Sequence, residues 1–408
     1  MAIYLETYGC TMNHADSEII KALLQDQLTD NINQADLIII NSCGVKGPTE
    51  HKIRKRITEI KEMGIPLIVA GCLPKISDID TNTVGTNVYD ITDAVKKVQN
   101  GGTVNIITNE KQNKLVYPRC GYTVTGIIPI SEGCLGSCTY CAARLARGSL
   151  YSYPAESVVK TAEHFIENGC KELQITSQDT GCYGIDLNER LPVLLEKVAS
   201  IPGKFKIRVG MMNPDHALDI LDDLINVYHN KKIYTFLHVP VQSGNNEILK
   251  KMNRKYTADE FVYVCNQFRK KFPHICVWTD IIVGFPTETD KQFYDTLKLV
   301  KKIMPDKINV TRFSPRPGTK AAQMPQIPGW IKKERSRSLH KLRMDISLRI
   351  NTKYVGNSYE VLITKKGSVE GTMVGRTHNY KPVICNGNLG EFKIVTINKV
   401  KPTYLIAL

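Results

Sequence analysis

The chain has 408 residues, of which 42% are hydrophobic and 23% are charged. These proportions are typical of a folded protein with a buried core, and the length predicts roughly two to four domains. Lys and Arg (54) outnumber Asp and Glu (40), which gives a formal net charge of +14. This excess favours a polyanionic partner, nucleic acid before an anionic membrane surface, although a basic protein without such a partner stays an alternative.

The apolar runs, such as residues 37–40 and 67–70, are far shorter than the roughly 20 residues of a membrane-spanning helix. The first residues, MAIYLETYGC, alternate like a strand and lack the basic segment and cleavage site of a secretory signal. We therefore expect a cytoplasmic protein with no membrane partner.

The 12 cysteines need a chemical explanation, because disulfides are rare in the cytoplasm. Metal or redox chemistry is the first candidate. Cys170, Cys265 and Cys276 lie in apolar or helix-like stretches, so we expect them to be small buried hydrophobic residues instead.

The first segment, residues 1–120, repeats one arrangement three times. A short apolar strand ends in a cysteine, at Cys10, Cys43 and Cys72, and at least twice a helix follows. Apolar strands that alternate with helices are typical of a parallel sheet covered on both faces. Ligands bind beyond the carboxyl ends of such strands. We therefore expect these three residues, the N-terminal cysteines, to converge on one rim of an open parallel α/β sheet domain.

The second segment, residues 121–345, alternates strands with helices. The expected strands are residues 123–130, 172–176, 206–211, 233–239, 277–283 and 307–312, and the expected helices are residues 154–168, 191–200, 214–228, 257–271 and 287–303. This pattern predicts a (βα)6 partial barrel, with its site at the carboxyl ends of the strands. A flat doubly wound sheet is the alternative.

The third segment, residues 346–408, has short alternating strands between Gly and Asn turns, which is typical of a small antiparallel β-barrel. The preceding stretch, WIKKERSRSLHKLRMDISLRI, is predicted to be a strongly basic connecting helix. Small barrels of this kind bind oligonucleotides or serve as protein interaction modules. The basic helix favours RNA binding.

Cys134, Cys138 and Cys141, the core cysteines, form a C-x3-C-x2-C run directly after the first strand of the second segment. Gly133 and Gly136 allow a short loop to wrap around a cluster. Three thiolates leave one iron of a [4Fe–4S] cluster open to an outside ligand. A structural zinc site is the alternative, but it usually has four protein ligands, and the sequence offers no obvious fourth.

The run ISEGCLGSCTYC resembles the signature of the radical S-adenosylmethionine (SAM) superfamily. With the N-terminal cysteines and the C-terminal barrel, the whole chain resembles the methylthiotransferase family, which combines a cluster-bearing N-terminal domain, a radical SAM core and a TRAM domain. The segments TSQDTGCYG, HVPVQSGNNEILKKMNRKY and TDIIVGFPTET look most like the archaeal and eukaryotic branch. That branch acts on threonylcarbamoyladenosine beside the anticodon of tRNA.

The resemblance implies two [4Fe–4S] clusters and SAM as cofactors. A cluster on the core cysteines would split SAM to a 5′-deoxyadenosyl radical, which removes hydrogen from carbon 2 of the target adenine. A cluster on the N-terminal cysteines would supply sulfur, and a second SAM would supply the methyl group. The implied partners are the tRNA anticodon stem-loop, an electron donor such as ferredoxin or flavodoxin, and a sulfur source.

Polar residues near the expected strand ends are candidates for cofactor binding. Arg208 is a plausible bidentate partner for the SAM carboxylate. Gln178, Asp179 and Gln242 could bond the SAM ribose or the target base. Arg147, just after the core cysteines, could stabilise the cluster and SAM or bind RNA phosphate. Each of them could instead be a satisfied structural polar group.

Other residues carry weaker expectations. His14 is expected not to be a metal ligand, although it follows Cys10 closely. Cys182 and Cys120 are expected to be unreactive thiols, with a sulfur relay as the alternative for Cys182. The basic run at residues 51–56 is either a solvated helix face or a contact with the anticodon stem.

Three functions of different kinds remain open. The first is tRNA methylthiolation, the second is methylthiolation of an aspartate of a ribosomal protein, and the third is RNA binding by a non-enzymatic protein with structural metal. The motifs and the net charge favour the first. The choice of threonylcarbamoyladenosine over isopentenyladenosine rests on resemblance alone.

Overall fold

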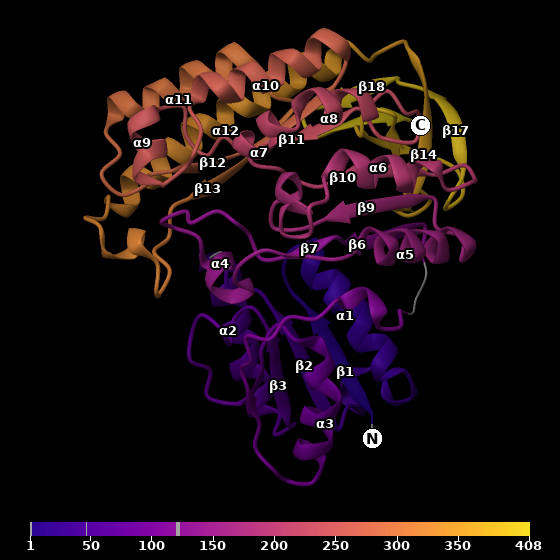
Figure 1. Cartoon of the computed structure of the whole chain (residues 1–408), viewed down its shortest axis with the longest axis vertical. Coiled ribbons are helices and arrows are strands. Elements are labelled where there is room, and N and C mark those ends of the chain that lie inside the picture. Colours follow the sequence, from indigo (N-terminus) through magenta and orange to yellow (C-terminus); the bar gives the residue numbers. More distant parts are fainter. Residues whose placement is uncertain (1, 46, 120–122) are drawn as a thin grey trace.

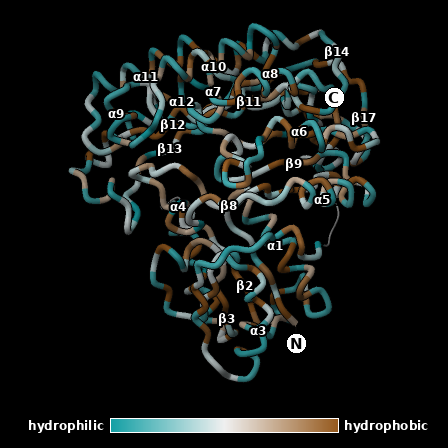
Figure 2. Tube along the Cα trace, viewed as in Figure 1, coloured by the Kyte–Doolittle hydropathy of each residue, from teal (hydrophilic) through white to brown (hydrophobic). Residues whose placement is uncertain are grey.

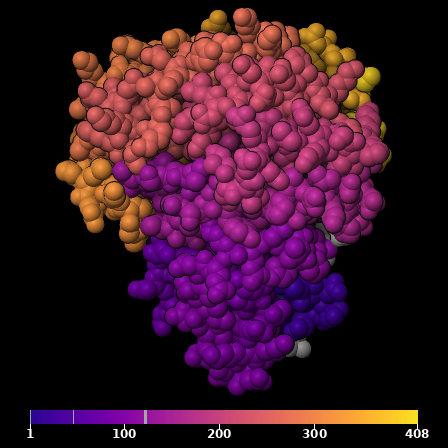
Figure 3. Space-filling model, in the orientation of Figure 1, coloured from indigo at the N-terminus to yellow at the C-terminus, as the bar shows by residue number. Residues whose placement is uncertain are grey.

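The computed structural model describes residues 2–45, 47–119 and 123–408. Figure 1 shows an N-terminal α/β domain, a wider central region and a C-terminal sheet packed beside that region. In the space-filling view the N-terminal domain is a narrower lobe below a broad body (Figure 3). Cys120 lies outside the described residues.

The N-terminal domain is built on a parallel sheet whose strands follow chain order. Along β2, Leu37 and Ile39 pack on the face that α1 and α3 cover, whereas Ile38 and Ile40 pack on the face that α2 covers. Figure 2 shows the hydrophobic colour concentrated along β2 and β3. The prediction of a parallel sheet covered on both faces is confirmed. The elements are β1 (Ile3–Thr7), α1 (Thr11–Leu23), β2 (Leu37–Ser42), α2 (Gly47–Glu62), β3 (Leu67–Gly71), β4 (Asn82–Val84), α3 (Ile91–Gln99) and β5 (Asn105–Ile106).

The central region is the predicted partial barrel. Its strands are β6 (Thr125–Pro129), β9 (Glu172–Thr176), β10 (Lys206–Val209), β11 (Phe236–His238), β12 (Cys276–Val283) and β13 (Lys307–Arg312). They are parallel and follow chain order, and a bridge between Ile207 and Ile233 joins the two halves. Because the order never reverses, the sheet is not doubly wound.

Helices α5 (Ala155–Glu167), α6 (Leu191–Ser200), α10 (Ala258–Lys271) and α11 (Asp290–Ile303) lie close to their predicted ranges. The single helix predicted at residues 214–228 is wrong. It is divided at Ile220 into α7 (Pro214–Asp219) and α8 (Leu221–Val227), because Ile220 leaves the helical conformation at φ −124° and ψ 19°. Cys170, Cys265 and Cys276 are fully buried, as predicted.

Residues 346–408, all of which the structure describes, contain β14 (Ser358–Lys366), β15 (Met373–Thr377), β16 (Pro382–Cys385), β17 (Phe392–Thr396), β18 (Lys399–Lys401) and β19 (Tyr404–Ala407). They form one curled sheet in the order β17-β14-β15-β16-β19-β18. Its neighbours are antiparallel except β16 and β19, which are parallel. The predicted small barrel is therefore a half-barrel that stays open between β17 and β18.

The basic connecting helix is α12 (Gly329–Thr352), and the boundary expected at residues 345/346 falls inside it. Arg335 anchors its first half through ion pairs to Glu288 at 2.8 Å and Asp290 at 2.7 Å. None of the described helices combines the length and the apolar character needed to cross a membrane.

The loop between β15 and β16 docks the half-barrel on the central region. Tyr380, 5% exposed, packs among the rings of Tyr234, Phe236 and Trp278. Beside it, the Lys381 ammonium pairs with the Asp306 carboxylate at 2.7 Å. The ring of Tyr380 holds its own backbone in the left-handed region, at φ 64°, a conformation that only well-packed surroundings retain.

We predict that Tyr380→Ala lowers the free energy of unfolding by about 3–5 kcal/mol, as large aromatic truncations in cores do. The reason is the loss of the ring that joins the two parts. Urea unfolding followed by circular dichroism measures the change. Tyr294→Ala, at a ring that is 52% exposed, is the matched control and should change stability by less than about 0.5 kcal/mol. Equal effects of the two substitutions would contradict the docking role.

Candidate functional site

The N-terminal cysteines converge at the carboxyl ends of β1, β2 and β3, as expected. Cys10 begins α1, and a Cβ added at Gly9 would lie 2.8 Å from the Cβ of Cys43, so these two turns touch. Gly9 has φ 134°, which a side chain would strain. Burial raises the pKa of the Cys72 thiol to about 11, and its neighbours Cys10 and Cys43 add to this rise.

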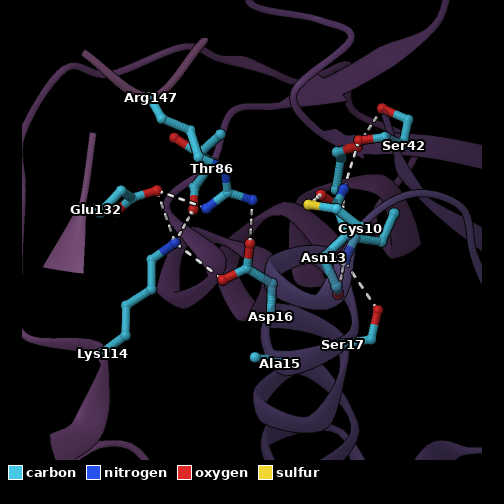
Figure 4. A network of polar contacts seen from close by, with 12 residues as sticks. Cys10, Asn13, Ala15, Asp16, Ser17, Ser42, Thr86, Lys114, Glu132 and Arg147 are labelled. Carbon is cyan, nitrogen blue, oxygen red and sulfur yellow. Dashed lines mark hydrogen bonds and ion pairs between the residues drawn. The ribbon is translucent and has the colours of Figure 1, made fainter. Parts of the chain in front are cut away.

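A buried network of side-chain amide hydrogen bonds, the amide ladder, holds the turns that carry the N-terminal cysteines. The Asn13 side chain donates to the Ser42 carbonyl at 2.8 Å, and the Asn41 side chain donates to the Asn13 carbonyl and to the Ser17 hydroxyl, each at 2.8 Å. The Cys10 thiol lies 3.4 Å from the Asn13 side-chain oxygen (Figure 4). Sequence reasoning missed Asn13 and Asn41, whose only signal was their place beside the cysteines.

The core cysteines also converge, in the loop that follows β7 (Ser131–Glu132). Cys141 caps α4 (Ala142–Arg147) by accepting the Arg144 amide at 3.4 Å. A Cβ added at Gly136 would lie 3.3 Å from the Cys134 sulfur and 3.8 Å from the Cys138 sulfur. The sulfurs of Cys134 and Cys138 therefore lie close to Gly136, whose missing side chain leaves space beside them.

Two polar groups hold the core loop in place. The amide of Gly133 donates to the side-chain oxygen of Gln178 at 2.6 Å. Arg254 donates to the Cys138 sulfur at 3.1 Å and to the Asn213 side-chain oxygen at 2.5 Å. Sequence reasoning missed Arg254, although it lies in the segment NRKY, which carried part of the family resemblance.

Asp179 is fully buried beside this loop. It accepts hydrogen bonds from the Asn213 side chain at 2.6 Å and from the His216 ring at 2.7 Å. Burial alone would lower the pKa of His216, but the hydrogen bond to Asp179 and its charge raise it to about 9. Asp179 therefore joins Asn213 and His216 in one buried network beside the core loop.

Cys182 lies next to Cys134, and its sulfur is 3.2 Å from the Asp179 carbonyl oxygen. The hydrogen bond between the Cys182 and Cys134 side chains is the largest cause that lowers the pKa of Cys134, to about 7. Cys182 was expected to be an unreactive thiol or a sulfur relay, and its contact with a core cysteine was not predicted.

Two other residues were predicted to bind SAM, Gln242 and Arg208. Gln242 is 9% exposed, and its backbone bridges to Ile281 of β12. The guanidinium of Arg208 lies over the rings of Phe236 and Tyr380. The structure thus places Arg208 at the docking surface of the C-terminal half-barrel and not with the core cysteines.

Arg147 points from α4 towards the N-terminal domain. Its guanidinium pairs with Asp16 at 2.7 Å and with Glu132 at 2.8 Å, and its charge lowers the pKa of Cys72 against the effect of burial. The side chain is 3% exposed, so the expected alternative of a contact with RNA phosphate does not fit this placement.

The N-terminal domain meets the central region at a second point. Arg316 forms an ion pair with Glu50 of α2, and the amide of Ala321 donates to the Thr139 carbonyl in the core loop at 2.8 Å. The segment between them therefore reaches from the N-terminal domain to the core cysteines. His14 is exposed on α1.

The basic run at residues 51–56 is largely tied to acids of the same domain. Arg54 pairs with Glu50 at 2.8 Å, and Arg56 pairs with Glu6 at 2.7 Å. This arrangement favours a structural helix face over a nucleic-acid contact.

Comparisons with known proteins agree with this division of the chain. Residues 2–91 match the uncharacterized protein family UPF0004, residues 128–300 match the Radical SAM superfamily, and residues 352–407 match the TRAM domain. The radical SAM match implies a [4Fe–4S] cluster and SAM. The radical SAM methyltransferase TsrM from Kitasatospora setae, which covers 79% of this chain and 77% of its own, has a similar fold with a TM-score of 0.59 and 14% identity.

Relatives cover the whole chain. A protein of Pyrococcus abyssi named probable threonylcarbamoyladenosine tRNA methylthiotransferase is 47% identical over 99% of this chain and 98% of its own length. The human threonylcarbamoyladenosine tRNA methylthiotransferase is 33% identical over 95% of this chain and 69% of its own length. The chain therefore belongs to the threonylcarbamoyladenosine tRNA methylthiotransferase family of the radical SAM superfamily.

Proposed function

We propose that this protein adds a methylthio group to carbon 2 of N6-threonylcarbamoyladenosine next to the anticodon of tRNA. The observation that carries the proposal is that the two cysteine sets are linked across the junction of the N-terminal and central parts by one side chain, Arg147. Arg147 lies between them: it starts from the helix that Cys141 caps, and its charge reaches Cys72. The names of the near full-length relatives support the same substrate.

The core cysteines fit a [4Fe–4S] cluster because they offer converging thiolates and leave one iron open to SAM. When bound there, the cluster with SAM supplies a carbon radical that removes hydrogen from the adenine. Arg254 offsets negative charge at Cys138, and Gln178 holds the start of the loop through the Gly133 amide. Gln242 and Asp179 are the residues we assign to ordering the SAM side of the site.

The N-terminal cysteines fit a second cluster for the same reason, and it would supply sulfur. The amide ladder of Asn13 and Asn41 keeps their turns in place when the sulfurs bind or release an outside atom. Arg147 offsets the negative charge that such a cluster brings to Cys72. The reaction also requires a one-electron donor such as ferredoxin or flavodoxin and a source of sulfur.

Recognition of tRNA is assigned to the half-barrel and to α12. The net charge of +14 provides the electrostatic attraction that phosphate backbones need. On α12, Lys333, Arg337 and Lys341 are exposed, whereas Arg335 on the opposite face is buried against Glu288. This division leaves one basic stripe of the helix available to an anticodon stem-loop.

We predict that a host that makes threonylcarbamoyladenosine but does not methylthiolate it gains the methylthio nucleoside when it expresses this protein. Mass spectrometry of nucleosides from its tRNA measures the product. Cys134→Ala should abolish both the product and SAM cleavage, because it removes a ligand of the proposed core cluster. Cys10→Ala should retain SAM cleavage but lose sulfur insertion.

Cys265→Ala is the control, because it also removes a thiol but at a fully buried position on α10, outside both cysteine sets. Methylthio product from the Cys10→Ala variant would exclude the two-cluster account. Product on another nucleoside or on a ribosomal protein, with loaded clusters, would replace the proposed substrate.

We also predict that the triple variant Lys333→Gln/Arg337→Gln/Lys341→Gln weakens tRNA binding about tenfold and lowers the salt dependence of the affinity. The reason is that a protein that contacts fewer phosphates releases fewer counterions from the tRNA when it binds. Filter binding at several salt concentrations measures both quantities. Lys21→Gln/Lys96→Gln/Lys97→Gln removes the same charge from exposed positions on α1 and α3 and should leave both nearly unchanged. Equal losses in the two triple variants would show that net charge alone, and not α12, attracts the tRNA.

A further inference from the structure

Among the described residues, four charged side chains meet in the interior where the N-terminal and central parts join (Figure 4). Asp16 comes from α1, Glu132 from β7, Arg147 from α4, and Lys114 from the 3-10 turn Lys114–Val116 in the connecting segment. Their exposed fractions are 1%, 2%, 3% and 1% in that order.

Each of these charges has two partners of opposite sign. The Lys114 ammonium lies 3.0 Å from Asp16 and 3.1 Å from Glu132. The Arg147 guanidinium lies 2.7 Å from Asp16 and 2.8 Å from Glu132. A further hydrogen bond from Lys114 to the Thr86 carbonyl, at 2.8 Å, ties the network to the N-terminal domain. The network is neutral, and all its members are satisfied only in this one placement of the two parts.

The network is attached to both cysteine rims by short rigid elements. Asp16 lies six residues after Cys10 on the helix that Cys10 begins, and Arg147 lies six residues after Cys141 on the helix that Cys141 caps. Glu132 lies two residues before Cys134. The ion pair between Asp16 and Arg147 therefore joins the first turns of the two sites through helices, which transmit position better than loops do.

We propose that Asp16, Lys114, Glu132 and Arg147 form a positioning network that fixes the N-terminal cysteines relative to the core cysteines, so that sulfur delivery stays coupled to radical formation. This inference rests on the proposed function. In that function, a radical formed at the core cysteines is productive only if sulfur held at the N-terminal cysteines can reach the same adenine. A small displacement between the rims leaves SAM cleavage intact and wastes the radical.

The test is the double variant Asp16→Asn/Lys114→Met. It removes one anion and one cation, so the network stays neutral, and it keeps the pair of Arg147 with Glu132. In the described structure the Asp16 carboxylate pairs with Lys114 and Arg147, and the Lys114 ammonium pairs with Asp16 and Glu132. The matched control is Lys204→Gln/Glu360→Gln, an exposed pair at 2.7 Å that also joins two parts of the chain, the central region and the half-barrel.

The first readout is the amount of 5′-deoxyadenosine formed per methylthio product by the cluster-loaded enzyme with tRNA. We expect this ratio to rise about tenfold or more in the double variant, because misplacement lowers the productive step selectively, and to stay unchanged in the control. A parallel fall of SAM cleavage and product, or an unchanged ratio, would overturn the proposal.

The second readout needs no cofactor. Amide hydrogen exchange of the cluster-free protein should become about tenfold faster in α1 and α4 of the double variant, but not in α10, because the junction opens locally. Unchanged exchange in α1 and α4 would overturn the positioning role. If the parent enzyme gave no methylthio product at all, the proposed function would fail while this exchange experiment still decided on the network.

Discussion

Parallel strands end on a common edge, and the convergence of the N-terminal cysteines depends on this constraint. β1, β2 and β3 each end in a tight turn, and each turn carries one of the N-terminal cysteines. The core cysteines instead share one loop, between β7 and α4. The N-terminal domain packs through α1 along β6, the edge strand of the partial barrel. Across this junction, Arg147 links the helix that follows the core cysteines to Asp16 and to Cys72.

The buried junction between the N-terminal domain and the central region contains charged side chains, which is unusual for a buried surface. Removing one partner from a buried ion pair costs about 3–5 kcal/mol, whereas an apolar junction of the same area tolerates small sliding motions. The network of Asp16, Lys114, Glu132 and Arg147 therefore contributes to specificity of placement more than to net stability. The contact of Arg316 with Glu50 fixes the opposite side of the junction. At the far end of the barrel, Tyr380 fixes the half-barrel by aromatic packing.

Much of this arrangement could be predicted from the sequence. The periodicity of apolar runs predicted both parallel sheets. The position of each N-terminal cysteine after a strand predicted one cysteine set, and the C-x3-C-x2-C spacing predicted the other, because these signals are local. Long-range partners have no such signal. Nothing near Lys114 indicates that it is buried with Asp16, and Arg208 looked suited to a SAM carboxylate until the structure placed it beside Tyr380. The break at Ile220 was missed because the apolar period continues across it. Arg147 was predicted near a cluster but not between two cysteine sets.

The central claim is that one chain holds two clusters on two separate sets of cysteines. Iron and sulfide analysis with Mössbauer spectroscopy of the anaerobically reconstituted protein tests it most directly. The account predicts about eight irons per chain as two [4Fe–4S] clusters, and about four in each variant in which the N-terminal or the core cysteines are all changed to alanine. About four irons in the unaltered protein, with none left after loss of the core cysteines, would contradict the account, and so would zinc in place of iron.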